Sequence, residues 1–308
     1  MPGGGGRVMA MVRLGILGCD TSHVVEFTRR LHGVDVPPEQ HVHGARVVAA
    51  WPGPPSEIAP QRVPGYVEAL RRMGVAIVDG PQDLMQHGVD AVLVEAQEGR
   101  LHAPLALPWL RAGIAVFVDK PFACSVADAA AMTEAAARTV TPLLSASSLR
   151  YAEEVLALDC GPIQGAQTHS PASLHPANPG LFHYGVHGVE MLYAVMGGPG
   201  CRSVRCVSQD GADGVLGVWA DGRLGSVRGL RHGHGGYGFT AFGTDGTVTA
   251  RIDTAFIYRN LLRVIVGVLS RRVTSQLSPE ELVEAVAFQD AARRSAEMDG
   301  DAVAVPTI

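Results

Sequence analysis

The stretch VFVDKPF, residues 116–122, decides how the first half of the chain folds. An apolar, β-branched run that ends in an acid, a lysine and a proline is typical of a buried strand that stops abruptly, because proline removes a backbone donor. A buried ammonium group needs a partner or a use, and open α/β sheets bind ligands at the carboxyl ends of their strands. Lys120 is therefore a candidate site residue, although a solvated loop lysine would give the same pattern.

Short apolar runs alternate with helical patterns on both sides of this stretch, between residues 12 and 145. We expect strands at 12–18, 45–51, 75–78, 91–94, 114–118 and 142–145, and helices at 24–31, 66–73, 81–87, 102–112 and 126–138. This alternation is typical of a doubly wound parallel sheet, the Rossmann-type α/β fold. The topology favours nucleotide binding but by itself names no function.

Length and composition narrow the class of protein. A chain of 308 residues favours two domains. Its net charge of −5 argues against nucleic acid as a partner, because phosphate binding requires a basic surface. No apolar run reaches the ~18 residues of a membrane-spanning helix. The five cysteines are scattered and form no close metal-type pairs, so we expect reduced thiols in a cytoplasmic protein.

The alternation of strand and helix patterns ends at about residue 145. We expect strands at 161–170, 203–209, 215–220, 225–230, 237–243 and 248–252, then helices at 256–269 and 282–297. Asp-Gly pairs at 221–222 and 245–246 favour tight hairpin turns. The second half is thus predicted to be an α+β domain with a mainly antiparallel, open sheet. Its uncovered face favours a homodimer or homotetramer.

These patterns divide the chain into three predicted parts. Residues 1–11 form a flexible, glycine-rich tail. Residues 12–145 form the dinucleotide-binding domain, and residues 146–308 form a substrate-binding and oligomerisation domain.

Three segments in order resemble one known family. They are Lys120-Pro121 after the fifth strand, GVHG at residues 185–188, and SAEMDG at residues 295–300. From Val12 to Val305 the chain resembles the Gfo/Idh/MocA family of glucose–fructose oxidoreductases and inositol dehydrogenases. The resemblance implies NAD or NADP in the first domain. It also implies oxidation or reduction of a sugar, cyclitol or polyol-like substrate between the domains.

The resemblance also implies roles for two residues. Lys120 would lie beside nicotinamide and substrate, and His187 would be the general acid/base. An imidazole can take the hydroxyl proton while hydride leaves for nicotinamide. A nearby cation stabilises the developing alkoxide and helps to keep the imidazole neutral.

The expected cofactor loop departs from the family pattern. Relatives carry Gly-x-Gly-x-x-Gly, whereas residues 18–23 read GCDTSH, and only Gly18 fits. Asp20 replaces the second glycine, and its carboxylate should repel a pyrophosphate unless it is turned away or paired. Thr21 and Ser22 would compensate as donors and caps at a helix N-terminus. The predicted cofactor-binding residues are Gly18, Asp20, Thr21, Ser22, His23, Trp51, Glu95 and Lys120.

Two further departures affect specificity. The second strand ends in WPGPP, residues 51–55, without the acid that would bind the ribose hydroxyls, so neither NAD nor NADP is favoured. Trp51 would stack on adenine or belong to the core. His183 replaces the aspartate of the relatives' Asp-x-Gly-x-His motif, so the proton relay or the preferred substrate would differ. The predicted substrate contacts are Arg150, His183 and Tyr184.

Two alternatives remain open at this point. His183 and His187 are four residues apart and would share a helix face as metal ligands of a hydrolase or lyase. No carboxylate–histidine signature joins them, so we predict no metal site. The altered loop instead allows a non-redox family member that acts as a binding or sensor protein.

Overall fold

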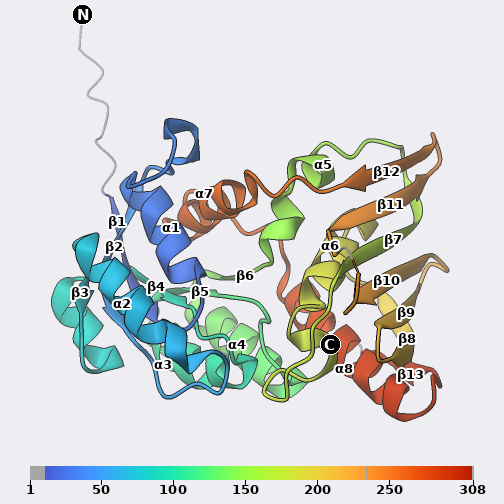
Figure 1. Ribbon diagram of the computed structural model, residues 1–308, viewed down its shortest axis with the longest axis horizontal. Coiled ribbons are helices and arrows are strands. Elements are labelled where there is room, and N and C mark those ends of the chain that lie inside the picture. Colours follow the sequence, from blue (N-terminus) through green and yellow to red (C-terminus); the bar gives the residue numbers. More distant parts are fainter. Residues whose placement is uncertain (1–10, 234, 307–308) are drawn as a thin grey trace, which may run out of the picture.

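The computed structural model describes residues 11–233 and 235–306. Two lobes lie side by side, each built around one β-sheet (Figure 1). The first ten residues of the predicted tail lie outside the described residues. No helix among the described residues combines the length and the apolar character needed to cross a bilayer.

The first lobe contains a six-stranded parallel sheet in the order β3-β2-β1-β4-β5-β6. Its strands are β1 Val12–Leu17, β2 Ala45–Trp51, β3 Ala76–Ile77, β4 Ala91–Val94, β5 Ala115–Val118 and β6 Leu143–Ser145. The helices between them are α1 His23–His32, α2 Val63–Arg72, α3 His102–Arg111 and α4 Val126–Thr139. This order confirms the predicted doubly wound sheet.

The two central strands β4 and β5 explain where the site lies. Every residue of both strands is buried, as expected for a parallel sheet covered on both faces. Val94 pairs with Val118, so the residues that follow them, Glu95 and Asp119, leave the sheet at the same edge. The loop after β1 leaves at this edge too, because Leu17 pairs with Val94. Parallel pairing thus gathers three loops from distant parts of the sequence.

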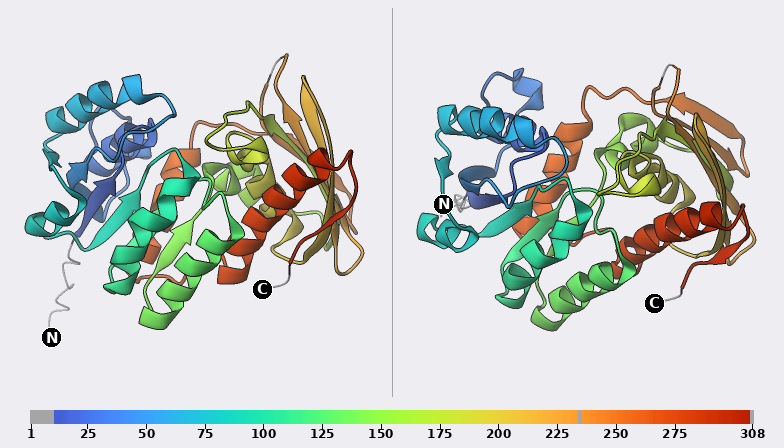
Figure 2. Two further views of the ribbon diagram at one scale, coloured as in Figure 1. Left: turned by 90° about the horizontal axis from the view of Figure 1, so that it is seen from below. Right: turned by 60° about the horizontal axis from the view of Figure 1, so that its bottom comes forward.

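The second lobe contains a seven-stranded sheet in the order β12-β11-β7-β10-β9-β8-β13. Its strands are β7 Ile163–Pro171, β8 Cys201–Gln209, β9 Ala212–Trp219, β10 Leu224–Leu230, β11 Gly238–Gly243, β12 Thr247–Arg251 and β13 Val303–Ala304. Only β7 and β10 pair in parallel within this described sheet, so the predicted antiparallel character is confirmed. Figure 2 shows helices on the inner face and none on the outer face.

The helices of the second half are α5 Glu153–Leu156, α6 Val186–Met196, α7 Ile257–Leu269 and α8 Pro279–Glu297. The sequence predicted α7 and α8 but placed no helix at α6. Ser278 caps α8 by accepting a hydrogen bond from the Glu281 amide, with proline at the first helical position. Gly188 lets α6 approach the sheet, because a Cβ there would lie 2.8 Å from the Ser170 hydroxyl.

The last two long helices connect the lobes. Leu261 and Ile265 of α7 belong to the same buried cluster as Phe27 and Phe117 of the first lobe. Val283 of α8 likewise packs into a buried cluster of the first lobe. In Figure 1, α7 lies close to α1, far from the second sheet. The C-terminal helices therefore hold the two sheets in a fixed relation around the space between them.

Candidate active site

A cavity of about 340 Å³ lies where the loops of the first sheet meet the start of α6. Larger hollows of 550 and 530 Å³ lie elsewhere, and neither is lined by Lys120 or His187. The predicted site residues that line the cavity are Thr21, Ser22, His23, Lys120, His183, Tyr184 and His187. Folding therefore brings together residues from both halves of the chain, as the resemblance implied.

Lys120 lies at the carboxyl end of β5, held by its backbone. Its amide donates to the Asp119 carboxylate at 2.8 Å, and the Asp119 amide donates to the Val94 carbonyl at 2.8 Å. Lys120 is also the only lysine among the 308 residues. The other 24 of the 25 Lys and Arg side chains are arginines. The half-buried ammonium group is the single amine side chain of the chain and faces the cavity.

His187 lies in the first turn of α6, almost fully buried. Burial, and next the positive charge of Lys120, lower the pKa of His187 from 6.5 to about 3. Its Nδ1 lies 2.7 Å from the Ser147 hydroxyl, which also accepts a hydrogen bond from the Leu149 amide. The ring is therefore neutral and fixed in orientation.

His183 and Tyr184, which precede the N-cap residue of α6, also line the cavity. Burial, followed by the charges of His175 and Lys120, lowers the pKa of His183 to about 4. The rings of Tyr184 and His187 meet edge to face, with centroids 5.8 Å apart. Tyr184 is 42% exposed and lines the cavity. Both residues occupy the places predicted for substrate contacts.

Hydrogen bonds between Asp20 and Gln97 hold the altered loop after β1 in place. Asp20 Oδ1 accepts a hydrogen bond of 2.9 Å from the Gln97 amide, and the Gln97 side chain donates to the Asp20 carbonyl. Asp20 is buried and does not line the cavity. The carboxylate is thus turned away from the anion-binding position. On the sequence alone, a pyrophosphate is expected to bind only if Asp20 is turned away or paired, and the first of these conditions is met.

The other loop residues keep features of a phosphate loop. Gly18 has φ of 93°, a left-handed conformation, and a Cβ there would lie 2.8 Å from the Ala96 amide nitrogen. Ser22 occupies the N-cap of α1, but its hydroxyl makes no capping hydrogen bond, contrary to the predicted role. The start of α1 faces the cavity through Thr21, Ser22 and His23, where a helix N-terminus favours an anion.

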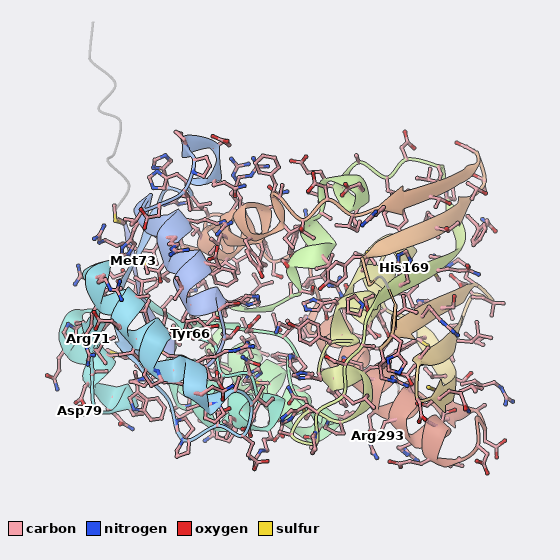
Figure 3. The ribbon with its side chains drawn as sticks, in the orientation of Figure 1. Tyr66, Arg71, Met73, Asp79, His169 and Arg293 are labelled. Carbon is pink, nitrogen blue, oxygen red and sulfur yellow. The ribbon has the colours of Figure 1, made fainter. Side chains whose placement is uncertain are left out.

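Trp51 and Arg150 lie outside the cavity lining, as do Gly18, Asp20 and Glu95 among the predicted site residues. Trp51 donates its indole N–H to the carbonyl of Asp79, labelled in Figure 3, at 3.1 Å, and packs against the core of the first lobe. Arg150 is buried between two carboxylates, at 2.5 Å from Glu190 and 2.6 Å from Glu281. Glu190 also accepts from the Ser147 amide, so Arg150 reaches His187 only through these neighbours.

Several cavity residues carried no signal in the sequence. Asn178 accepts from the Gly99 amide and donates to the Gln97 carbonyl, which ties the second half of the chain to the cofactor loop region. Tyr237 and Tyr258 also line the cavity. These residues come from loops and a helix start, and only the tertiary fold brings them to the site.

Glu95 lies next to the cavity as part of a buried group that we call the His23 cluster: His23, Glu95 and Asp119. Their ligand atoms lie within 4.8 Å of one another, and His23 Nδ1 is 2.8 Å from Asp119 Oδ2. Both Glu95 oxygens are buried without a hydrogen-bond partner. Burial, and next the charge of Asp119, raise the pKa of Glu95, whereas Lys120 opposes this shift.

The histidine pair considered as metal ligands is arranged differently from the prediction. His183 precedes α6, which begins at Val186, so it shares no helix face with His187. His169, labelled in Figure 3, lies on β7 and does not line the cavity. Among the described residues, the group of three or more candidate donors that lie close together is the His23 cluster.

Comparison with known proteins shows which family the chain is similar to. Residues 56–145 match the family described as "Oxidoreductase family, NAD-binding Rossmann fold", GFO_IDH_MocA. No curated protein matches the sequence. The match and the fold confirm the predicted resemblance to Gfo/Idh/MocA oxidoreductases, with the family match covering part of the Rossmann-type half of the chain.

Solved structures share this fold over almost the whole chain. GenD2 from gentamicin A biosynthesis, in complex with NAD, has a TM-score of 0.78 and 19% identity, with 99% of each chain covered. The myo-inositol dehydrogenase of Lactobacillus casei, in complex with NAD(H) and myo-inositol, has a TM-score of 0.77 and 15% identity over 97% of this chain and 98% of the other. The myo-inositol dehydrogenase of Corynebacterium glutamicum ATCC 13032 has a TM-score of 0.77 and 15% identity over 97% and 100%.

Proposed function

We propose that the protein transfers hydride between NAD or NADP and a hydroxyl or carbonyl group of a sugar-, cyclitol- or polyol-like molecule. One observation carries the proposal: Lys120 of the first lobe and His187 of the second line the same cavity. A cation and a neutral imidazole at one cavity suit the removal of a hydroxyl proton and the stabilisation of the resulting alkoxide. The solved structures with inositol and NAD(H) support this substrate class.

The residues of the chain would hold and protonate the substrate. With its pKa lowered to about 3, His187 is neutral near pH 7 and can exchange a proton with the substrate oxygen. Ser147 fixes the ring, and Lys120 stabilises negative charge on that oxygen. His183 and Tyr184 would bind further hydroxyl groups. When bound, the nicotinamide supplies the hydride acceptor or donor.

Arg150 enters this proposal as a positioning residue and not as a substrate contact. Its guanidinium binds Glu190, Glu190 accepts from the Ser147 amide, and the Ser147 hydroxyl contacts His187. This chain of contacts orients the imidazole from behind the cavity.

The cofactor would lie across the carboxyl edge of the first sheet. Gly18 and the first turn of α1 suit a pyrophosphate, because Asp20 is turned to the Gln97 amide and the helix start favours an anion. The edge near β2 lacks the acid that selects NAD, and Arg62 lines the cavity nearby. The choice between NAD and NADP is therefore left to measurement.

The first experiment is a calorimetric titration of the ligand-free protein with NAD(H) and NADP(H) in parallel. We expect micromolar binding of one pair, followed by nicotinamide absorbance changes with a panel that contains myo-inositol, scyllo-inositol and glucose. His187→Gln should keep cofactor binding and lose turnover. Failure of all four nucleotides to bind at millimolar concentration would favour the alternative, a non-redox binding or sensor protein, for which the panel would be tested by calorimetry alone.

We further propose a cytoplasmic homodimer or homotetramer that pairs through the second sheet. The outer face of this sheet has no covering helix (Figure 2), and it carries the partly exposed Leu216, Val218 and Leu224. All five cysteines are free thiols, as in a reducing compartment. Light scattering would test the assembly: Leu216→Glu should lower the mass to that of a monomer, and a monomeric wild-type protein would refute it.

A further inference from the structure

The His23 cluster has an unbalanced charge. Two of its three members, Glu95 and Asp119, are carboxylates, and their ligand atoms lie within 4.8 Å of each other and of the His23 ring nitrogen. Lys120 is the permanent cation that acts on both Glu95 and Asp119. Glu95 is fully buried and its two oxygens have no hydrogen-bond donor. Such a carboxylate is expensive to bury and calls for a ligand or a proton.

The geometry of the cluster suits a metal ion. One imidazole nitrogen and two carboxylates offer ligand atoms within 4.8 Å of one another, close enough for one ion to contact all three. The donors are also fixed. Phe27 stacks on the His23 ring at 4.9 Å and Tyr258 meets it edge-on at 5.1 Å, while the Lys120 amide fixes the other Asp119 oxygen.

We propose that His23, Glu95 and Asp119 bind one divalent transition-metal ion beside the cavity. A mixed set of one nitrogen and two oxygen donors suits Zn²⁺ or Mn²⁺. Three protein ligands leave at least one coordination position for a further ligand, and His23 itself lines the cavity. The ion supplies positive charge to the two carboxylates of the cluster, and Glu95 becomes a ligand.

This site does not depend on the proposed redox function, since its test measures metal binding and not turnover. The single lysine provides a reporter. Protein labelled with [¹⁵N]lysine gives one backbone amide signal, that of Lys120, whose N–H donates to Asp119. Protein without a histidine tag is stripped with a chelator and titrated with Zn²⁺ and, separately, with Mn²⁺.

We expect Zn²⁺ to shift the Lys120 signal with a stoichiometry of one ion per chain and Mn²⁺ to broaden it beyond detection. Glu95→Gln keeps the side-chain shape and removes the charge, so it should weaken metal binding by at least ~100-fold, more than loss of an outer-shell partner does. His183→Gln, which changes a cavity histidine outside the cluster, is the matched control and should bind as the wild type does.

Thermal unfolding gives an independent measurement. Zn²⁺ should raise the Tm of the wild type and of His183→Gln but not of Glu95→Gln or His23→Gln, because a ligand that binds only the folded state stabilises it. Circular dichroism verifies that each variant folds. An unchanged Lys120 signal at millimolar Zn²⁺ and Mn²⁺ would overturn the proposal and leave Glu95 as a buried neutral acid. An equal response of wild type and Glu95→Gln would overturn it as well.

Discussion

The protein contains two buried groups of charged side chains that differ in whether their carboxylates have partners. In the first, which we call the arginine cluster, Arg150 lies between Glu190 and Glu281 and binds both. In the His23 cluster, Asp119 binds His23, but Glu95 has no hydrogen-bond partner. Both groups are removed from water, so burial alone does not distinguish them.

The difference indicates what each group does. Carboxylates that are paired on every side hold elements in place, and in the arginine cluster they join α6 and α8 to the segment after β6. A buried carboxylate without a partner keeps its capacity to bind, which is why such groups gather at functional sites. The arginine cluster is therefore expected to govern stability, and the His23 cluster together with Lys120 to govern ligand binding and chemistry.

The largest expected effect comes from breaking the arginine cluster. Arg150→Met keeps much of the side-chain volume but leaves Glu190 and Glu281 buried without a cation, which should lower the free energy of unfolding by ~3–5 kcal/mol. Urea unfolding measures this loss. Arg138→Met removes an exposed pair with Glu134 and should change stability little. A loss below ~1 kcal/mol for Arg150→Met would mean that the cluster is not structural.

The next largest effect concerns Lys120, whose replacement should lower activity and leave the fold intact. Lys120→Ala should lower kcat/KM for the best substrate of the panel by ~10²–10³-fold, because the cation that stabilises the alkoxide is lost. The folded structure, followed by circular dichroism, should remain. Lys120→Arg keeps the charge and should retain part of the activity. Turnover by Lys120→Ala at the wild-type rate would refute the assignment of the active site.

The fold was predictable because its signals are local. Apolar runs such as 91–94 and 114–118 are short, continuous and separated by helical patterns, so the parallel sheet follows from their order. The Asp-Gly pairs indicated where strands end at the two hairpin turns of the second half. Helix α6 was missed because Gly185 and Gly188 argue against a helix, whereas the structure uses Gly188 for close packing on the sheet.

The site was predictable where it lies at the end of a strand or carries a family motif. Lys120, His183 and His187 fall in these places and line the cavity. The environment of Arg150 was not predictable, because the two carboxylates that bind it come from residues 40 and 131 positions further along the chain. Asn178 and Tyr258 reach the cavity through tertiary packing alone, and no sequence pattern reports such long-range contacts.

The pH dependence of stability tests the electrostatics of His187. Because burial and Lys120 lower its pKa from 6.5 to about 3, the unfolded chain binds a proton below pH 6.5 that the folded chain does not. The free energy of unfolding should therefore fall by ~1–2 kcal/mol between pH 7 and pH 5 from this residue. His187→Gln should reduce this slope in urea unfolding, whereas His43→Gln, at an exposed position, should keep it. An equal slope in His187→Gln and the wild type would contradict the lowered pKa.

The smallest expected effect separates the charge of Asp20 from its role in holding the loop. Asp20→Asn removes the charge but keeps an oxygen acceptor for the Gln97 amide, so the loop after β1 should stay in place. Since the carboxylate is already turned away from the cavity, the Kd for NADH should change by less than ~3-fold, whereas Asp20→Gly loses the acceptor and should bind more weakly. Calorimetry on both variants measures this. Binding that is more than ~10-fold tighter in Asp20→Asn would mean that Asp20 repels the pyrophosphate after all, and that its charge acts on the cofactor and not only on the His23 cluster.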